Sequence, residues 1–175
     1  MSETDASFDV DSRSVEETQR IGAAIASLLD PGDVVLLVGE LGVGKTTLTK
    51  AIVEALGSTG VTSPTFTLCH RYDSSPPVAH VDCYRVDDGD ALADLALGEM
   101  LDDGYVAIVE WGERLSDRLG GDALQCTLAT GLGDDFDQRL VTLRTRGTRW
   151  SSRADELHDR VTTSLATTPN GRQAT

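Results

Sequence analysis

The sequence predicts an α/β fold with a mixed, mainly parallel central sheet and an antiparallel extension near its C-terminus. Short, almost wholly apolar runs rich in valine occur at residues 33–38 and 104–111, and such runs are typical of strands covered on both faces. The first run leads into a glycine-rich turn and then a helical pattern. Two further strand-like segments, 123–130 and 138–147, flank a turn region and predict the antiparallel pair.

The length and composition of the chain limit its class. Its 175 residues are 39% hydrophobic, which is enough for one core of ordinary size and one domain, placed at residues 14–150. Fifteen basic residues against 29 acidic ones give a formal charge of −14, so the bare protein repels RNA and anionic membranes outside local basic patches. We therefore expect a partner protein to handle any nucleic acid.

The cysteines and the N-terminus predict a cytoplasmic protein. Cys69, Cys83 and Cys126 lie in apolar strand-like runs without CxxC spacing, which favours reduced core thiols over a zinc site. The first twelve residues are acidic and polar, unlike a secretory signal, and no apolar run is long enough to span a bilayer.

Several further elements follow from local patterns. Residues 1–13 are expected to be flexible, and Ser14 with Glu17 then forms a capping pattern before an apolar helical face that ends near residue 30. Residues 151–175 are expected to be an extension, a short helix followed by a disordered tail. The remaining expected elements are a helix over 44–56, extended segments over 65–72 and 78–86, a helix over 90–101 and a short helix over 113–119.

Residues 39–46, GELGVGKT, match the phosphate-binding pattern G-x-x-x-x-G-K-[ST] between a predicted buried strand and a predicted helix. Glycines allow the backbone N–H groups to curl around phosphates, and the helix N-terminus adds partial positive charge. A lysine in this position reaches the terminal phosphates, and the following hydroxyl serves Mg²⁺. The expected phosphate-binding residues are Gly39, Gly42, Val43, Gly44, Lys45, Thr46 and Thr47. This loop predicts a P-loop NTPase-like, three-layer version of the α/β fold.

Two carboxylates end predicted strands, Asp82 after VAHV and Glu110 after VAIV. In a parallel sheet both strand ends lie at the edge where the phosphate loop sits, so either acid could hold Mg²⁺ directly or through water. The alternative for each is a solvated acid at a strand end. The sequence does not decide which of the two is the direct ligand.

Four blocks together resemble the TsaE (YjeE) family of ATPases in tRNA threonylcarbamoyladenosine biosynthesis. They are GELGVGKTTLTK, SPTFTL at residues 63–68, HVDCYR at residues 80–85 and VEW at residues 109–111, in the order and spacing of the family. The resemblance covers about residues 14–147. The phosphate loop alone occurs in many NTPases, but the four blocks in combination are highly specific.

The resemblance implies an ATPase that supports turnover of a TsaB–TsaD complex, in which TsaD modifies the adenosine beside the tRNA anticodon. Contact with tRNA would then be indirect. The resemblance also implies ATP and Mg²⁺ as cofactors, with Thr46 and Glu110 at the metal and Asp82 as a catalytic or metal-linked acid. Thr65 would lie in a switch-like loop near the γ-phosphate, where Pro64 biases the preceding residue toward extended geometry.

For other residues of the four blocks, the sequence allows two interpretations of the role of the side chain. His80 and Tyr84 are expected to pack or to support the site, Arg85 to neutralise charge or contact a partner, and Trp111 to cover the nucleotide or simply pack. The sequence departs from the family pattern at Gly112, where proline is frequent, and at Cys69, which replaces an aliphatic residue.

Three other functions use the same loop. A small-molecule kinase would need an acceptor pocket and an arginine-rich lid, for which Arg114 and Arg118 are sparse. A GTP switch would carry an N-K-x-D motif, and the sequence has none. A nucleotide-dependent interaction module with incidental hydrolysis remains open on sequence grounds.

Overall fold

The computed structural model describes residues 5–64, 67–84, 96–114, 121–131 and 137–167. Its strands are β1 Ser7–Ser12, β2 Val34–Val38, β3 Cys69–Tyr72, β4 Val78–Asp82, β5 Val106–Glu110, β6 Ala123–Thr130 and β7 Arg139–Arg146. Its helices are α1 Val15–Ala26, α2 Lys45–Ala55, α4 Leu97–Asp102, the 3₁₀ turn η1 Gly112–Arg114, α5 Gly147–Ser151 and α6 Ala154–Ala166.

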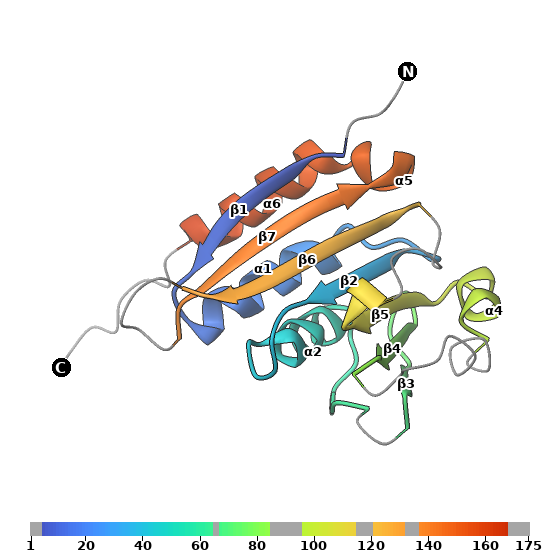
Figure 1. The fold of residues 1–175 in the computed structure, drawn as a ribbon. Helices are drawn as coiled ribbons and strands as arrows, with labels where there is room; N and C mark the ends of the chain where they lie inside the picture. The colour runs from blue at the N-terminus through green and yellow to red at the C-terminus, as the bar shows by residue number, and fades with distance from the viewer. Residues whose placement is uncertain (1–4, 65–66, 85–95, 115–120, 132–136, 168–175) are drawn as a thin grey trace.

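The strands form one seven-stranded mixed sheet in the order β1-β7-β6-β2-β5-β4-β3 (Figure 1). Strands β6, β2, β5 and β4 are parallel neighbours and form the core of the sheet. Strands β7 and β1 continue it antiparallel on one side, and β3 pairs antiparallel with β4 on the other. The predicted α/β fold with a parallel core and a C-terminal antiparallel pair is confirmed.

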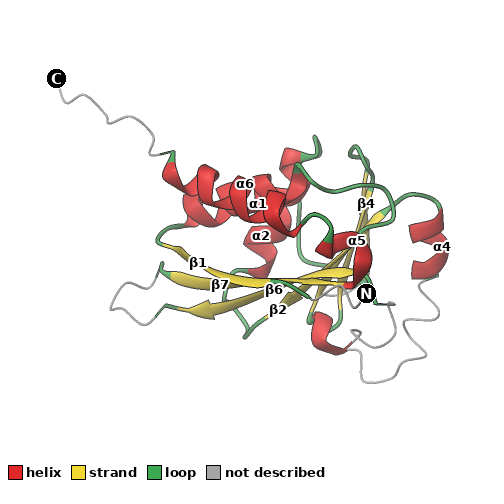
Figure 2. Cartoon of the chain, turned by 90° about the horizontal axis from the view of Figure 1, so that it is seen from above, coloured by secondary structure: helices red, strands yellow, loops and turns green. Residues whose placement is uncertain are grey.

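The two faces of the sheet are covered differently (Figure 2). Helices α1, α2 and α6 lie on one face, where Val35 and Leu37 of β2 join their apolar side chains in the larger core cluster. Val34 and Leu36 point to the opposite face and join a smaller cluster that includes α4. Alternation along one strand therefore buries both faces, as the apolar sequence of β2 requires.

Strand β1 corrects the expectation of a flexible segment at residues 1–13. Phe8, Val10 and Ser12 are half-buried or buried, whereas the residues between them are exposed. This alternation suits an edge strand, and β1 pairs with β7 from Ser7↔Arg144 to Ser12↔Arg139. The strand was missed because SFDVDS contains only two apolar residues, and pairing supplies the rest of its stabilisation.

Most of the other expected elements are present with shifted ends. The Ser14 side chain accepts a hydrogen bond from the Glu17 N–H and caps α1, as predicted. The C-terminal helix begins at Ala154 and buries Leu157 and Val161. The expected strand over 65–72 is shorter, because only Cys69–Tyr72 pairs with β4. Parts of the expected helices at 90–101 and 113–119, and the tail from residue 168, fall outside the described residues.

None of the three cysteines forms a disulfide. Cys83 and Cys126 are buried and Cys69 is half-buried, where burial raises the pKa of its thiol. Within the described ranges, no helix combines the length and apolar character needed to cross a bilayer.

The C-terminal extension is bound to the sheet by a buried ion cluster around Asp33, which directly precedes β2. Arg153 donates two hydrogen bonds of 2.8 Å to the Asp33 carboxylate, and Arg149 Nε lies 2.9 Å from the same group. The Asp30 N–H donates a further bond of 2.8 Å to it. The hydrogen bond to Asp33 raises the pKa of Arg153, so this guanidinium is a permanent charge partner.

Candidate nucleotide-binding site

The predicted phosphate loop connects β2 to α2 and has the backbone that its glycines allow. Gly39, Gly42 and Gly44 have φ angles of 145°, 77° and 116°, all in the region that favours glycine. A Cβ at Gly39 would meet the carbonyl oxygen of Leu128 and lie 2.9 Å from Val43 Cγ1. Gly39 therefore serves both a turn and a close approach to β6.

Lys45, the first residue of α2, is folded back over this loop. Its Nζ donates hydrogen bonds of 2.7 Å to the carbonyl oxygens of Gly39 and Glu40 and lies 4.0 Å from the centre of the Trp111 ring. Burial lowers the pKa of Lys45, and the negative charges of Glu110, Glu113 and Asp82 partly offset that effect. The ammonium group thus lies at the centre of an acidic site and is held by neutral acceptors.

The two predicted acids meet beside the first turn of α2. Asp82 and Glu110 are paired in register at the ends of β4 and β5, and both are at least nine-tenths buried. Thr46 Oγ1 donates to Glu110, 2.9 Å from Oε1 and 3.2 Å from Oε2. Because its proton goes to Glu110, the lone pairs of the Thr46 hydroxyl are available to a cation.

Asp82 is held differently from Glu110. Its Oδ1 accepts the Tyr84 N–H at 2.9 Å, and its Oδ2 accepts the Ser63 hydroxyl at 3.3 Å. The first residue of the SPTF block is therefore in contact with the acidic site. Thr65 itself lies outside the described residues, so its role in that loop remains a prediction.

These groups open into a cavity of about 290 Å³. Tyr84 and Trp111 form one aromatic wall, with ring centres 5.1 Å apart, and Leu41 at the tip of the loop is 77% exposed. The cavity is lined by Leu41, Gly42, Gly44, Lys45, Thr46, Thr47, Ser63, Asp82, Tyr84, Glu110 and Trp111. Most of the predicted phosphate-binding residues and both acids thus face one space. Gly39 and Val43 do not line it.

Comparisons with known proteins show the family of the chain. The family model "Threonylcarbamoyl adenosine biosynthesis protein TsaE" matches residues 12–139. The chain belongs to the TsaE family. It is therefore a component of tRNA threonylcarbamoyladenosine biosynthesis, and the family resemblance of its four sequence blocks is confirmed.

Relatives and a solved structure extend the match beyond the phosphate loop. The TsaE protein of Streptomyces coelicolor is 44% identical over 140 residues, 77% of this chain and 94% of the relative. The TsaE protein of Bacillus subtilis is 39% identical over 150 residues, which cover 83% and 92% of the two chains. The crystal structure of B. subtilis YdiB superposes with a TM-score of 0.73 at 32% identity, covering 89% of this chain and 97% of YdiB.

Two further residues of this TsaE chain contribute to the site: Arg139, which the sequence analysis did not single out, and His80, which it expected to pack or to support the site. Arg139 of β7 donates from Nε to the Val43 carbonyl at 2.7 Å and so braces the phosphate loop from the antiparallel extension. His80 of β4 lies with Nε2 2.9 Å from Glu110 Oε1. An arginine at a strand start carries no local signal of such a contact, whereas the position of His80 two residues before Asp82 places both on one face of β4.

Gly112, where the TsaE pattern often has proline, is packed against β2. A Cβ at this position would lie 2.7 Å from Leu36 Cβ, so glycine allows η1 to approach the strand closely. A proline also carries a Cβ and would require Leu36 to shift. The departure from the family pattern therefore has a packing explanation in this chain.

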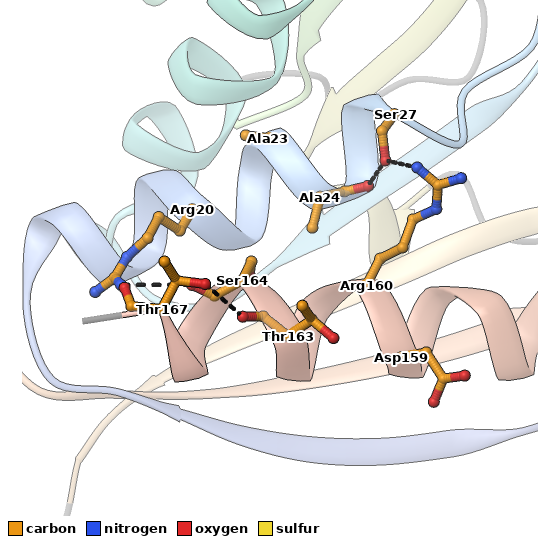
Figure 3. Close-up of a pocket in the computed structure, with 9 residues that line it drawn as sticks. All are labelled: Arg20, Ala23, Ala24, Ser27, Asp159, Arg160, Thr163, Ser164 and Thr167. Atoms are coloured by element: carbon orange, nitrogen blue, oxygen red, sulfur yellow. Dashed lines mark hydrogen bonds between the residues drawn. The ribbon is translucent and has the colours of Figure 1, made fainter. Parts of the chain in front are cut away.

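A larger cavity, of about 550 Å³, lies between α1 and α6 (Figure 3). Its guanidinium groups are engaged, since Arg20 donates to the Thr167 carbonyl and Arg160 bonds to Ser27 and Glu156. Its walls also include small residues such as Ala23 and Ala24. Without a cluster of free polar groups, this cavity has less capacity for chemistry than the smaller one at the phosphate loop.

Proposed function

We propose that this TsaE chain binds ATP with Mg²⁺ and hydrolyses it to support repeated turnover of TsaB- and TsaD-type partners, with tRNA contacted through the complex. The observation that carries the proposal is the meeting of Lys45, Thr46, Asp82 and Glu110 around one cavity beside a glycine-rich loop and a helix N-terminus. These are the groups that phosphoryl chemistry requires: a phosphate cradle, a cation and oxygen ligands for a metal.

The charge balance of the site supports a divalent cation. Glu110 is 4% exposed, and among the described residues no lysine or arginine lies within ion-pair distance of its carboxylate. A buried carboxylate without a cationic partner is costly, and a metal ion would repay that cost. Within the described ranges, no three His, Cys, Asp or Glu side chains form a metal cluster, so phosphate and water would complete the coordination.

Each residue has a distinct proposed role. Gly39, Gly42, Val43, Gly44 and Thr47 would shape the loop and present backbone N–H groups and a hydroxyl to the phosphates, and Lys45 would leave its carbonyl acceptors to bind the terminal phosphates. Thr46 and Glu110 would hold the metal. Asp82, fixed by Tyr84 and Ser63, would orient water or serve the metal through it, and Thr65 would close on the γ-phosphate.

Reconstituted tRNA modification with TsaB- and TsaD-type partners tests the proposal. We expect a similar first round with and without this protein, and several further rounds only when the protein and ATP are present. Equal multiple-turnover yields with and without the protein would contradict the proposed role. Transfer of labelled γ-phosphate to a nucleoside, or preference for GTP, would contradict the ATPase assignment.

Two variants separate hydrolysis from simple assembly. Lys45→Ala should abolish ATP binding and multiple turnover together, because the phosphates lose their cation. Glu110→Ala should retain ATP binding and fail to sustain repeated rounds. If Glu110→Ala sustains them at the wild-type level, nucleotide-dependent assembly and not hydrolysis is the function.

A further inference from the structure

We propose that His80 is a positioning residue for Glu110: its Nε2–H fixes the carboxylate so that one oxygen is occupied by protein donors and the other faces the metal. This inference rests on the proposed role of Glu110 as a metal ligand. The roles proposed for the phosphate loop and the two acids leave the histidine of the HVDCYR block without a function, and this inference gives it one.

The topology brings His80 and Glu110 together. His80 is paired with Ile108 across the parallel β4–β5 ladder, and Asp82 is paired with Glu110. Side chains two residues apart on a strand share a face, so His80 and Asp82 lie on the same face as Val78, and Glu110 lies on the same face as Ile108. Val78 and Ile108 belong to the same core cluster as Leu48 of α2, so this is the face that α2 covers. His80 occupies the inner position, with no exposed surface.

The two carboxylate oxygens of Glu110 accept hydrogen bonds unequally. Oε1 of Glu110 lies 2.9 Å from His80 Nε2 and 2.9 Å from Thr46 Oγ1. Within the described part of the chain, Oε2 has only the longer contact of 3.2 Å with the same Thr46 hydroxyl. With both donors concentrated on Oε1, Oε2 keeps its acceptor capacity for a cation or for water bound to one.

The second ring nitrogen supports this proton assignment. Nδ1 of His80 is buried, and among the described residues it has no hydrogen-bond partner. A buried N–H without an acceptor costs more than a buried lone pair without a donor, because the donor's single proton then has no partner at all. A neutral imidazole with its proton on Nε2 satisfies Glu110 and leaves no donor unpaired.

The ring is also held in place. Tyr72 of β3 stacks on His80 with ring centres 6.4 Å apart and planes 29° apart. The Tyr72 hydroxyl donates to the Thr62 carbonyl and accepts the Thr62 N–H, at 3.1 and 3.2 Å. Tyr72, itself held by hydrogen bonds to Thr62, therefore packs on the imidazole from the β3 side, while Glu110 lies on the β5 side. A residue that orients a metal ligand has to be fixed in this way.

The test compares His80→Gln, His80→Asn and His80→Leu. A glutamine places its amide N–H near the position of Nε2, whereas the shorter asparagine carries the same amide but does not reach it, and leucine has no donor. Mn²⁺ affinity of the ADP-bound protein, measured by electron paramagnetic resonance, is the main readout. ADP affinity without metal and the thermal midpoint are measured for every variant.

We expect His80→Asn and His80→Leu to weaken Mn²⁺ binding by about tenfold or more, and His80→Gln to stay within about threefold of wild type. ADP affinity without metal should change by less than about twofold in all three variants. If His80→Leu does not fold, the Gln–Asn pair decides the question, because both retain an amide. Equal Mn²⁺ affinities for Gln and Asn, or wild-type affinity in Leu, would overturn the inference. Loss of multiple turnover is measured separately, so failure of the proposed ATPase function is distinguishable.

Discussion

Two buried carboxylates lie at opposite ends of the parallel core and are balanced in opposite ways. Asp33 precedes β2, its side chain is fully buried, and two guanidinium groups and a backbone N–H surround it. Glu110 ends β5, is 4% exposed, and accepts hydrogen bonds from a threonine hydroxyl and an imidazole. The first carboxylate has two arginines at ion-pair distance, whereas among the described residues the second has no lysine or arginine at that distance.

This difference distinguishes a carboxylate that stabilises the fold from one that can bind a cation. A buried ion pair with complete hydrogen bonding is part of the fold, and removing one partner leaves the other as an unpaired buried charge. A buried carboxylate without a lysine or arginine at ion-pair distance is a site where a bound cation lowers the energy of the folded protein. The nearby ammonium of Lys45 donates its hydrogen bonds to loop carbonyls, so it interacts with Glu110 through space and not as a hydrogen-bonded ion pair.

The largest expected effect is on the rate of Glu110→Gln. The amide keeps the shape of the side chain and removes the charge, so hydrolysis by the partner-bound protein should fall about 10³-fold, or about 4 kcal/mol in the activation barrier. The free energy of unfolding of the isolated protein should be unchanged or higher, because a buried charge is lost. Single-turnover kinetics and urea denaturation measure the two quantities. Glu54→Gln, an exposed surface change, is the control and should alter neither.

The next effect is the loss of stability in Asp33→Asn. Removing this charge leaves Arg153 without its bidentate partner, and we expect a loss of about 3 kcal/mol in the free energy of unfolding. Asp30→Asn is the matched control, because Asp30 is 68% exposed and lies 3.6 Å from the same arginine. It should cost less than about 0.5 kcal/mol. Equal losses in both variants would show that burial does not distinguish these acids.

The stabilisation gained from bound nucleotide should also differ between variants at the two ends of the parallel core, Asp33→Asn and Glu110→Gln. Mg²⁺–ADP at 100 times its dissociation constant should stabilise the wild-type protein by about 2.7 kcal/mol. Asp33→Asn should gain the same increment from its lower baseline, since the Asp33 cluster is remote from the cavity. Glu110→Gln should gain less at the same total Mg²⁺ concentration. Thermal denaturation with and without ligand checks this, and loss of the increment in Asp33→Asn would contradict the separation.

The smallest effect concerns the titration of Lys45. The chain has two lysines, Lys45 and Lys50, so NMR of reductively methylated protein gives few signals, and Lys45→Arg assigns them. Because burial lowers the pKa of Lys45, its signal should titrate below the ordinary lysine value of about 10.4. As the pH rises, the folded state then releases this proton at a lower pH than the unfolded state does. The contribution of Lys45 to stability should therefore rise with pH through that window. A midpoint at or above the ordinary value would contradict burial as the dominant cause.

Local patterns were sufficient to predict the parallel core and to bring the glycine-rich loop and the two acids to the same edge of the sheet. The apolar runs of β2 and β5 and the glycines of the phosphate loop carry their own signals of period and turn geometry. The acids Asp82 and Glu110 could be brought together because parallel strands end at a common edge. Thr65 is not tested, since it lies outside the described residues.

Contacts between distant segments could not be predicted in the same way. The bond from Arg139 to Val43 joins residues 96 positions apart, and the burial of Asp33 depends on α5 and α6 returning to the start of β2. Strand β1 likewise becomes recognisable only once β7 offers it a partner. Such features depend on tertiary packing, which overrides weak local preferences.

Strand β1 also determines how the protein can be shortened or joined to other proteins. It covers β7 along its length, and its outward residues include Asp9 and Asp11, whose charges discourage another chain from adding to the sheet. Removing residues 1–4 leaves this barrier in place, together with the hydrogen bonds between Ala6 and Thr145. Removing residues 1–12 would uncover the hydrogen-bonding edge of an eight-residue strand and invite association between molecules through exposed backbone. An N-terminal fusion should therefore end before Asp5.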